Sequence, residues 1–398
     1  MKIFPITSVL HDADAVAAST RDFLATLGLD ETVVDTDFEH YGSGNPDLIY
    51  VRTGGTEGVF RDLLPQLRRQ SSAPVYLLAS GTSNSLAASM EILSYLVQHN
   101  VPGEILHGSS EYVSQRIAQL KCESEARYSL RGKRVGIVGA PSDWLISSLV
   151  DRNEVRNRLG IELIDIDMNE LLNEIEATPM PENVSLDAVA PTAAIADALP
   201  GAERIYRALK ALVTRHNLSG LTVRCFDLLT TVHNTGCLAL ARLNSEGIVA
   251  GCEGDVPALL SMMVAHAATR CTGFQSNPAR INVETGEILM AHCTIPLGMV
   301  DRYELDTHFE SGIGVGIRGY RTAGNVTLFK LSGDLKRVFA AEGQLLRCGN
   351  EGDLCRTQMT IRLNNAEDTH YFLTAPIGNH HIVVPGHHAR LLKAVLQA

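Results

Sequence analysis

The chain has 398 residues, of which 45% are hydrophobic and 20% are charged, and its formal net charge is −11. This length exceeds what one hydrophobic core usually supports, so two or three packed domains are expected, and the ordinary globular composition excludes a disordered chain. The negative charge and the absence of basic runs longer than two residues exclude nucleic acid and anionic membranes as expected partners, because both attract clustered Lys and Arg.

Over the first 130 residues, short apolar runs alternate with amphipathic segments. The runs typical of strands are 3–9, 48–51 and 75–78, and the segments typical of helices are 14–27, 59–68, 84–98 and 109–121. This alternation predicts a parallel sheet flanked by helices. Two loops rich in small polar residues, 52–57 and 80–84, follow predicted strands, at the edge where such sheets bind ligands.

A second α/β unit is predicted from residue 131 to residue 270. The basic residues at 131–134 interrupt the apolar pattern, and 135–139 is typical of a new first strand. Further strands are expected at 162–166, 221–225 and 247–250, and helices at 143–159, 194–216 and 256–270.

From residue 271 to residue 398 the pattern changes to short β-prone runs separated by turns, such as 286–290, 325–329 and 359–362, with a closing helix from His388. The predicted fold class is therefore α/β: two doubly wound, Rossmann-like domains (1–130 and 131–270), then an antiparallel β-rich domain (271–398) that forms a barrel or sandwich.

No stretch approaches about 18 uncharged apolar residues, and the N-terminus lacks the pattern of a secretory signal. We therefore expect a cytoplasmic protein that does not enter a membrane. The eight cysteines contain no CxxC pair, so most are expected to be reduced, buried thiols.

Glu253 is the first candidate for chemistry. It follows a predicted strand and lies between two glycines, where a metal ligand or general base is often placed, although an exposed loop carboxylate fits the same pattern. Asp255 suits the N-cap of the helix that follows and needs no function.

Histidines supply the second candidate group. His292 lies in an apolar strand, where a histidine that is hydrogen-bonded within the core is the usual alternative to a ligand. Residues 377–388 contain four of the chain's 14 histidines. Because neighbouring strand residues face opposite sides, only one of His380 and His381 can face a given cleft. One Glu and two His would form a mixed oxygen and nitrogen site suited to Mn²⁺, Co²⁺ or a similar ion.

Six short motifs, in this order and spacing, resemble the L-fucose isomerase and L-arabinose isomerase superfamily over nearly the whole chain, in particular its shorter fucose isomerase-like members. They are 222–226 (TVRCF), 236–239 (GCLA), 252–255 (CEGD), 292–296 (HCTIP), 307–310 (THFE) and 378–381 (GNHH).

The resemblance implies a homo-oligomeric aldose-ketose isomerase for a monosaccharide or a deoxy-, sulfo- or phospho-sugar. It implies a divalent ion, usually Mn²⁺, with Co²⁺ or Zn²⁺ as alternatives, and proton transfer through a cis-enediol. It assigns the metal to Glu253, His292 and His381, with Glu253 also moving the proton. His380 is the register alternative, and otherwise a substrate-binding residue.

The resemblance also implies substrate contacts, some of them from a neighbouring subunit. The candidates are Arg224, His308, Arg52, Thr53, Thr82 and Asn84. Arg224 fits a salt bridge with Asp227 equally well, and His308 fits a surface loop.

One position departs from the family. Asn277, or its neighbour Ser276, stands where a second, catalytic carboxylate is expected. An amide oxygen can bind a hard metal but cannot exchange a proton. Another acid could replace it, and the candidates are Asp227, Glu284, Glu287 and Glu310. Alternatively, the chain is a sugar- or metal-binding homologue without turnover. A third alternative is a related reaction, catalysed by an epimerase or a lyase.

Overall fold

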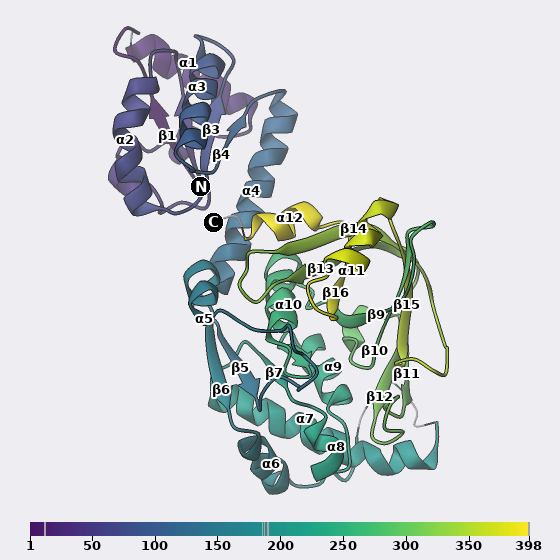
Figure 1. The fold of residues 1–398 in the computed structure, drawn as a ribbon. Coiled ribbons are helices and arrows are strands. Elements are labelled where there is room, and N and C mark those ends of the chain that lie inside the picture. Colours follow the sequence, from purple (N-terminus) through teal and green to yellow (C-terminus); the bar gives the residue numbers. More distant parts are fainter. Residues whose placement is uncertain (12, 185, 187, 189–190, 397–398) are drawn as a thin grey trace. The chain divides into compact units, whose positions relative to one another are not determined.

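The computed structural model describes residues 1–11, 13–184, 186, 188 and 191–396. It divides into two compact units, residues 1–126 and residues 127–396 (Figure 1). Parallel sheets with helices and an antiparallel β-rich part are both present, which confirms the predicted fold class. Among the described helices, none combines the length and the apolarity needed to cross a membrane.

The first unit is built on a parallel sheet in the order β1-β2-β3-β4. Alternate residues of β2 pack into separate apolar clusters, Ile49 and Val51 into one and Leu48 and Tyr50 into the other, so both faces are covered. The elements are β1 (Lys2–Ile6), α1 (Ala13–Thr26), β2 (Asp47–Val51), α2 (Glu57–Gln70), β3 (Val75–Ala79), α3 (Ser85–Gln98), β4 (Gly103–Leu106) and α4 (Ser110–Leu130), which continues into the second unit.

The second unit begins with another parallel sheet, in the order β6-β5-β7-β8. Its strands are β5 (Arg134–Val138), β6 (Glu162–Ile166), β7 (Gly220–Val223) and β8 (Val249–Cys252). Its helices are α5 (Arg152–Glu154), α6 (Met168–Ala177), α7 (Ala193–Arg215), α8 (Asp227–Thr231), α9 (Cys237–Ser245) and α10 (Val256–Thr269). Glu253 follows β8 directly, at the carboxyl edge of this sheet.

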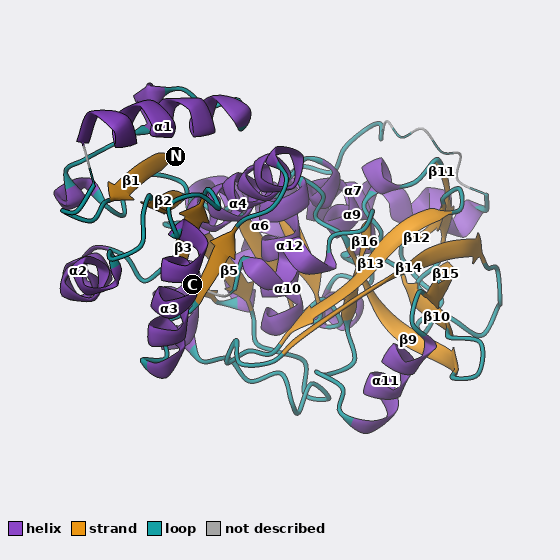
Figure 2. Cartoon of the chain, turned by 90° about the horizontal axis from the view of Figure 1, so that it is seen from above, coloured by secondary structure: helices purple, strands orange, loops and turns teal. Residues whose placement is uncertain are grey.

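The rest of the second unit is a closed antiparallel barrel in the order β10-β15-β14-β13-β16-β9, accompanied by a hairpin of β11 and β12 (Figure 2). The elements are β9 (Phe274–Asn282), β10 (Glu287–His292), β11 (Arg302–Asp306), β12 (Gly316–Tyr320), β13 (Gly324–Leu331), β14 (Val338–Cys348), β15 (Thr357–Leu363), α11 (His370–Thr374), β16 (His381–Pro385) and α12 (Ala389–Ala394).

Helix α10 joins the parallel sheet to the barrel. It contacts β7 and β8 on one side and β13 and β16 on the other, and every residue from Val256 to Ala265 is buried. Asp255 is its N-cap, as expected, because its carboxylate accepts from the amide of Ala258 over 2.8 Å. The first turn of α10 is therefore held at the junction of the two layers.

The expected helix at 143–159 is wrong over residues 143–151. Only α5 and a π-helical turn at Val155–Leu159 are helical, while residues 143–151 form turns and irregular structure. Trp144, Ile146 and Leu149 are exposed, so this segment lacks the buried apolar stripe that stabilises a surface helix. The amide of Ser142 instead donates to the carbonyl of Glu253 over 2.9 Å, which ties the segment to the candidate site.

Candidate active site

A left-handed turn places Glu253 between β8 and α10. Glu253 has a φ of 65° and Gly254 a φ of 69°, so two consecutive residues lie in a region that L side chains rarely adopt. A Cβ on Gly254 would lie 2.4 Å from the carbonyl oxygen of Ala140, so this position requires glycine. The turn keeps Glu253 buried, with 7% of its surface exposed, rather than on an open loop.

Two imidazoles face the Glu253 carboxylate. The Nε2 of His292, the last residue of β10, lies 3.6 Å from its Oε1, and the Nε2 of His380 lies 3.4 Å from the same oxygen. The two rings meet edge to face, with centroids 5.4 Å apart. Residues far apart in the sequence therefore form one buried group of a carboxylate and two imidazoles.

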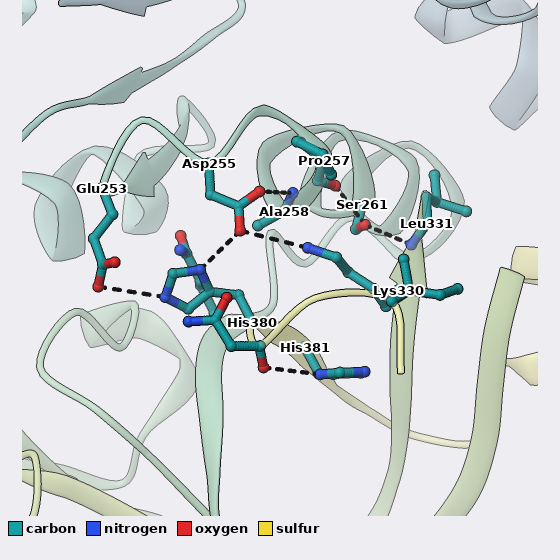
Figure 3. Close-up of polar contacts among 12 residues, drawn as sticks. Glu253, Asp255, Pro257, Ala258, Ser261, Lys330, Leu331, His380 and His381 are labelled. Carbon is teal, nitrogen blue, oxygen red and sulfur yellow. Dashed lines mark hydrogen bonds and ion pairs between the residues drawn. The ribbon is translucent and has the colours of Figure 1, made fainter. Parts of the chain in front are cut away.

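His381 differs from the expectation, because it is His380 that faces Glu253 (Figure 3). The Nδ1 of His381 donates to the carbonyl of Asn379 over 3.0 Å, and its Nε2 accepts from the hydroxyl of Tyr371 over 2.9 Å. Its ring packs against Phe339 and Phe372. Both nitrogens of His381 are thus used within the barrel, since strand alternation turns the two neighbouring histidines to opposite sides.

A cavity of about 50 Å³ lies beside Glu253 and His292. Asn277, on β9, also lines it, and the Oδ1 of Asn277 is buried without a hydrogen-bond partner among the described residues. The Nε2 of His380 is likewise buried and, apart from its approach to Glu253 over 3.4 Å, has no hydrogen-bond partner in the described part of the chain. Buried polar atoms are normally paired, so two unsatisfied atoms beside one carboxylate mark a place where a ligand would complete the bonding.

Sulfur atoms surround the same cavity. Five of the eight cysteines line it: Cys225, Cys237, Cys252, Cys293 and Cys355. All are free thiols, as expected, and the Sγ atoms of Cys225 and Cys252 are 2.9 Å apart. Cys252, Glu253 and His292 each offer a donor atom within 4.8 Å of the others, a spacing that can hold a metal ion.

Aromatic and acidic residues form the outer wall of the site. The Nε1 of Trp144 donates to the Oε2 of Glu253 over 2.6 Å, and the Trp144 ring meets Phe226 edge to face at 4.8 Å. Phe226 in turn meets the ring of His308 at 5.5 Å. His308 is buried and lines the cavity, as does the exposed Glu310. The THFE motif therefore supplies two cavity residues.

Several sequence candidates are engaged elsewhere. The guanidinium of Arg224 is paired with Asp143 at 2.7 Å and with Asp227 at 3.2 Å, which is the salt-bridge alternative. Glu287 pairs with Arg362 over 2.6 Å. Arg224, Asp227, Glu284 and Glu287 do not line the cavity.

The N-terminal candidates lie in the other unit. Arg52 and Thr53 line a separate pocket there, and the buried Nε of Arg52 has no hydrogen-bond partner among the described residues. The hydroxyl of Thr82 is within 3.0 Å of the hydroxyl of Ser80, and Asn84 precedes α3 with a φ of 58°.

The charges of the site favour an anionic Glu253. Burial raises the pKa of the Glu253 carboxyl, but His292 and His380 outweigh this effect and hold its pKa well below the usual range. Burial also lowers the pKa of His380, but Asp255 and Glu253 raise it to about 9. Without a ligand the site therefore pairs the Glu253 carboxylate with a protonated His380, and a metal ion that took His380 as a ligand would displace that proton.

Fold and site together define an α/β protein with a buried carboxylate and two imidazoles at the carboxyl edge of a parallel sheet. No model of a known protein family matches the chain. The chain is similar to proteins named sulfoquinovose isomerase. It is 22% identical over 262 residues to that of Alkalicoccus urumqiensis, 22% over 308 residues to that of Priestia aryabhattai, and 26% over 196 residues to that of Clostridium sp. strain MSTE9.

These matches cover 62%, 73% and 46% of this chain and 59%, 68% and 42% of the relatives, respectively. The chain thus spans less than two thirds of the length of the Alkalicoccus protein. The similarity is to sugar isomerases, in agreement with the resemblance of the motifs.

Proposed function

We propose that the protein is a divalent-metal-dependent aldose-ketose isomerase of the fucose and arabinose isomerase superfamily. Its substrate would be a monosaccharide or a modified one, with a sulfo-sugar as the first to test because the relatives are named for sulfoquinovose. The observation that carries this proposal is the buried Glu253 carboxylate, flanked by two imidazoles, together with the unsatisfied Oδ1 of Asn277 on the wall of the same cavity.

The donor set fits a divalent ion. Glu253 would supply an anionic oxygen, Asn277 a neutral oxygen, and His292 and His380 nitrogens, a mixture that suits Mn²⁺. The nearby thiol of Cys252 makes Co²⁺ or Zn²⁺ reasonable alternatives. A bound ion would polarise adjacent carbonyl and hydroxyl oxygens of a sugar and so acidify the C–H bond between them.

Proton exchange needs a second acid or base, because the low pKa of Glu253 suits a ligand better than a base. Glu253 and Glu310 are the carboxylates among the described residues that line the cavity. We assign this role to Glu310, which would replace the carboxylate expected at position 277. His308, three residues before Ser311 and bonded to its hydroxyl over 3.0 Å, would orient a substrate hydroxyl.

The reacting carbon atoms of the sugar would lie in the cavity, beside Glu253 and His292. The rest of the sugar would extend outward past Trp144 and Phe226 and need further contacts. In this proposal a homo-oligomer supplies them through Arg52, Thr53, Thr82 and Asn84 of a neighbouring copy.

The test uses C2-deuterated aldoses, including sulfoquinovose, with Mn²⁺. We expect ketose to appear while the label is lost to water, and Glu310→Gln to reduce the rate about 10²- to 10⁴-fold. Glu367→Gln, at an exposed position, is the matched control and should leave the rate unchanged. No ketose across a broad panel of aldoses would overturn the proposal.

Asn277 favours the alternatives of a sugar- or metal-binding protein without turnover, or of an epimerase or lyase, because an amide cannot exchange a proton. The same deuterium experiment separates them. Sugar binding without loss of label indicates a binding protein, and loss of label with an epimer or a cleaved product indicates the related chemistries.

A further inference from the structure

A buried ion pair stands behind His380, on the side away from Glu253. The Oδ2 of Asp255 lies 2.8 Å from the Nδ1 of His380 and 3.6 Å from the Nζ of Lys330 (Figure 3). Asp255 and His380 are each 0% exposed, and Lys330 is 1% exposed. Four residues thus form one line of contacts: Lys330, Asp255, His380 and Glu253.

Lys330 breaks the apolar pattern of its strand. Val326, Leu328 and Lys330 alternate along β13, and the first two belong to the apolar core of the barrel. The Nζ of Lys330 makes no hydrogen bond with a described residue, and Asp255 is the carboxylate it faces. Burial of a lysine costs desolvation free energy, and an apolar side chain of similar size would stabilise the fold equally well. Stability alone therefore does not explain Lys330.

Asp255 uses its two carboxylate oxygens for different tasks. Its Oδ1 caps α10 by accepting from the amide of Ala258, while its Oδ2 accepts from the ring of His380. Because α10 packs on both the sheet and the barrel, this carboxylate is held rigidly. A bond to Nδ1 fixes the plane of the imidazole and leaves Nε2 directed toward Glu253.

We propose that Asp255 and Lys330 are positioning residues that hold His380 so that its Nε2 faces Glu253. Lys330 faces the Oδ2 of Asp255, and Asp255 supplies the bond that orients the imidazole. This inference rests on the proposed function for its use of the metal, although the contacts themselves do not depend on it.

Asp255→Asn is the sharpest change. An amide has one acceptor and one donor end, whereas Asp255 faces a donor at each oxygen, so Asn can satisfy Ala258 or His380 but not both. We expect Mn²⁺ affinity, measured by electron paramagnetic resonance, to fall about 10- to 100-fold. Asp167→Asn is the matched control, because Asp167 also caps a helix, α6, through the amide of Asn169, and its carboxylate has no hydrogen bond to a histidine among the described residues.

The same substitution in a His380→Gln background separates positioning from general damage. If Asp255 acts through His380, Asp255→Asn should weaken Mn²⁺ binding no further once His380 is gone. Equal losses in both backgrounds, or wild-type affinity in Asp255→Asn, would overturn the inference.

Lys330→Met tests whether Lys330 contributes to the position of His380. It should weaken Mn²⁺ binding, and the double variant Asp255→Asn with Lys330→Met should be no weaker than Asp255→Asn alone. Lys330→Met alone removes the cation that faces the buried Asp255 carboxylate and could prevent folding. The double variant removes both charges of this pair, so its Mn²⁺ affinity can still be measured. If the losses of Mn²⁺ affinity in the two single variants add up in the double variant, Lys330 does not act through Asp255.

Nuclear magnetic resonance can test the hydrogen bond between Asp255 and His380 without metal. In protein labelled with ¹⁵N-histidine, the Nδ1 proton of His380 should give a slowly exchanging downfield signal, identified by its loss in His380→Gln. We expect the signal to persist in Asp167→Asn and to be lost in Asp255→Asn. If the wild-type protein binds no Mn²⁺, the proposed function fails, but this signal still tests whether Asp255 positions His380. An unchanged signal in Asp255→Asn would refute that positioning role.

Discussion

The indole of Trp144 donates to the Oε2 of Glu253 over 2.6 Å, and Trp144 is the only tryptophan of the chain. The side chain is half exposed and is attached to a segment without helical structure. The fluorescence of one residue therefore reports directly on the carboxylate at the centre of the site.

The first prediction uses this reporter. Titration with Mn²⁺ should quench the tryptophan fluorescence along a saturable curve, because a paramagnetic ion on Glu253 would lie close to the indole. Glu253→Gln should remove the saturable part, whereas Glu367→Gln should not. A wild-type protein that binds Mn²⁺ by paramagnetic resonance with no change in fluorescence would place the ion elsewhere.

Asn277→Asp should restore the second carboxylate and tighten Mn²⁺ binding by about tenfold or more, since an added anion attracts the cation in a buried cavity. Without metal, repulsion from Glu253 should lower the free energy of unfolding, and Mn²⁺ should more than recover it. Both are measured by denaturant unfolding with and without Mn²⁺. Asn282→Asp, at an exposed position on β9, is the control and should show neither effect.

Backbone strain at Glu253 gives a third prediction. A φ of 65° costs an L residue about 1–2 kcal/mol, which glycine avoids. The metal-free Glu253→Gly variant should therefore unfold at a higher denaturant concentration than Glu253→Ala, with a difference of about 1 kcal/mol. Equal stability of the two variants would show that the turn imposes no strain.

His381 gives a prediction for acid stability. Burial lowers the pKa of His381 to about 3, below the value near 6.5 of an unfolded chain. Between these values the unfolded state binds a proton that the folded state does not, so stability falls as the pH drops from 6.5 toward 3. The loss from this one group is at most about 1.4 kcal/mol per pH unit.

His381→Gln should therefore show a shallower decline of unfolding free energy over this pH range than wild type. His370→Gln, on an exposed histidine, should keep the wild-type slope. Parallel slopes for wild type and His381→Gln would mean that His381 is not held neutral in the fold.

The periodicity of the sequence predicted both parallel sheets, because buried strands and amphipathic helices leave clear patterns, but it missed the edge strand β4, which is only partly buried. It also placed Glu253 at the end of β8 and Asp255 at the N-cap of α10, since both depend on local turn chemistry. The helix at 143–159 failed because tertiary contacts, not periodicity, decide that segment.

The choice between His380 and His381 depends on the register of β16, which a sequence pattern cannot fix to one residue. The hydrogen bond of Asp255 to the imidazole depends on contact with His380, which lies 125 residues further along the chain. Lys330 left a visible signal, a lysine where alternation along β13 calls for an apolar side chain, but its partner could be found only in the folded structure.

Distance along the chain also constrains when the site can exist. Glu253 follows β8 of the parallel sheet, and His292 ends β10. His380 immediately precedes β16, the strand that closes the barrel between β13 and β9. During synthesis, a nascent chain that has emerged only as far as α10 would lack both imidazoles. Competence to hold an ion would therefore arise only when barrel closure is complete, which would keep incomplete chains from capturing metal.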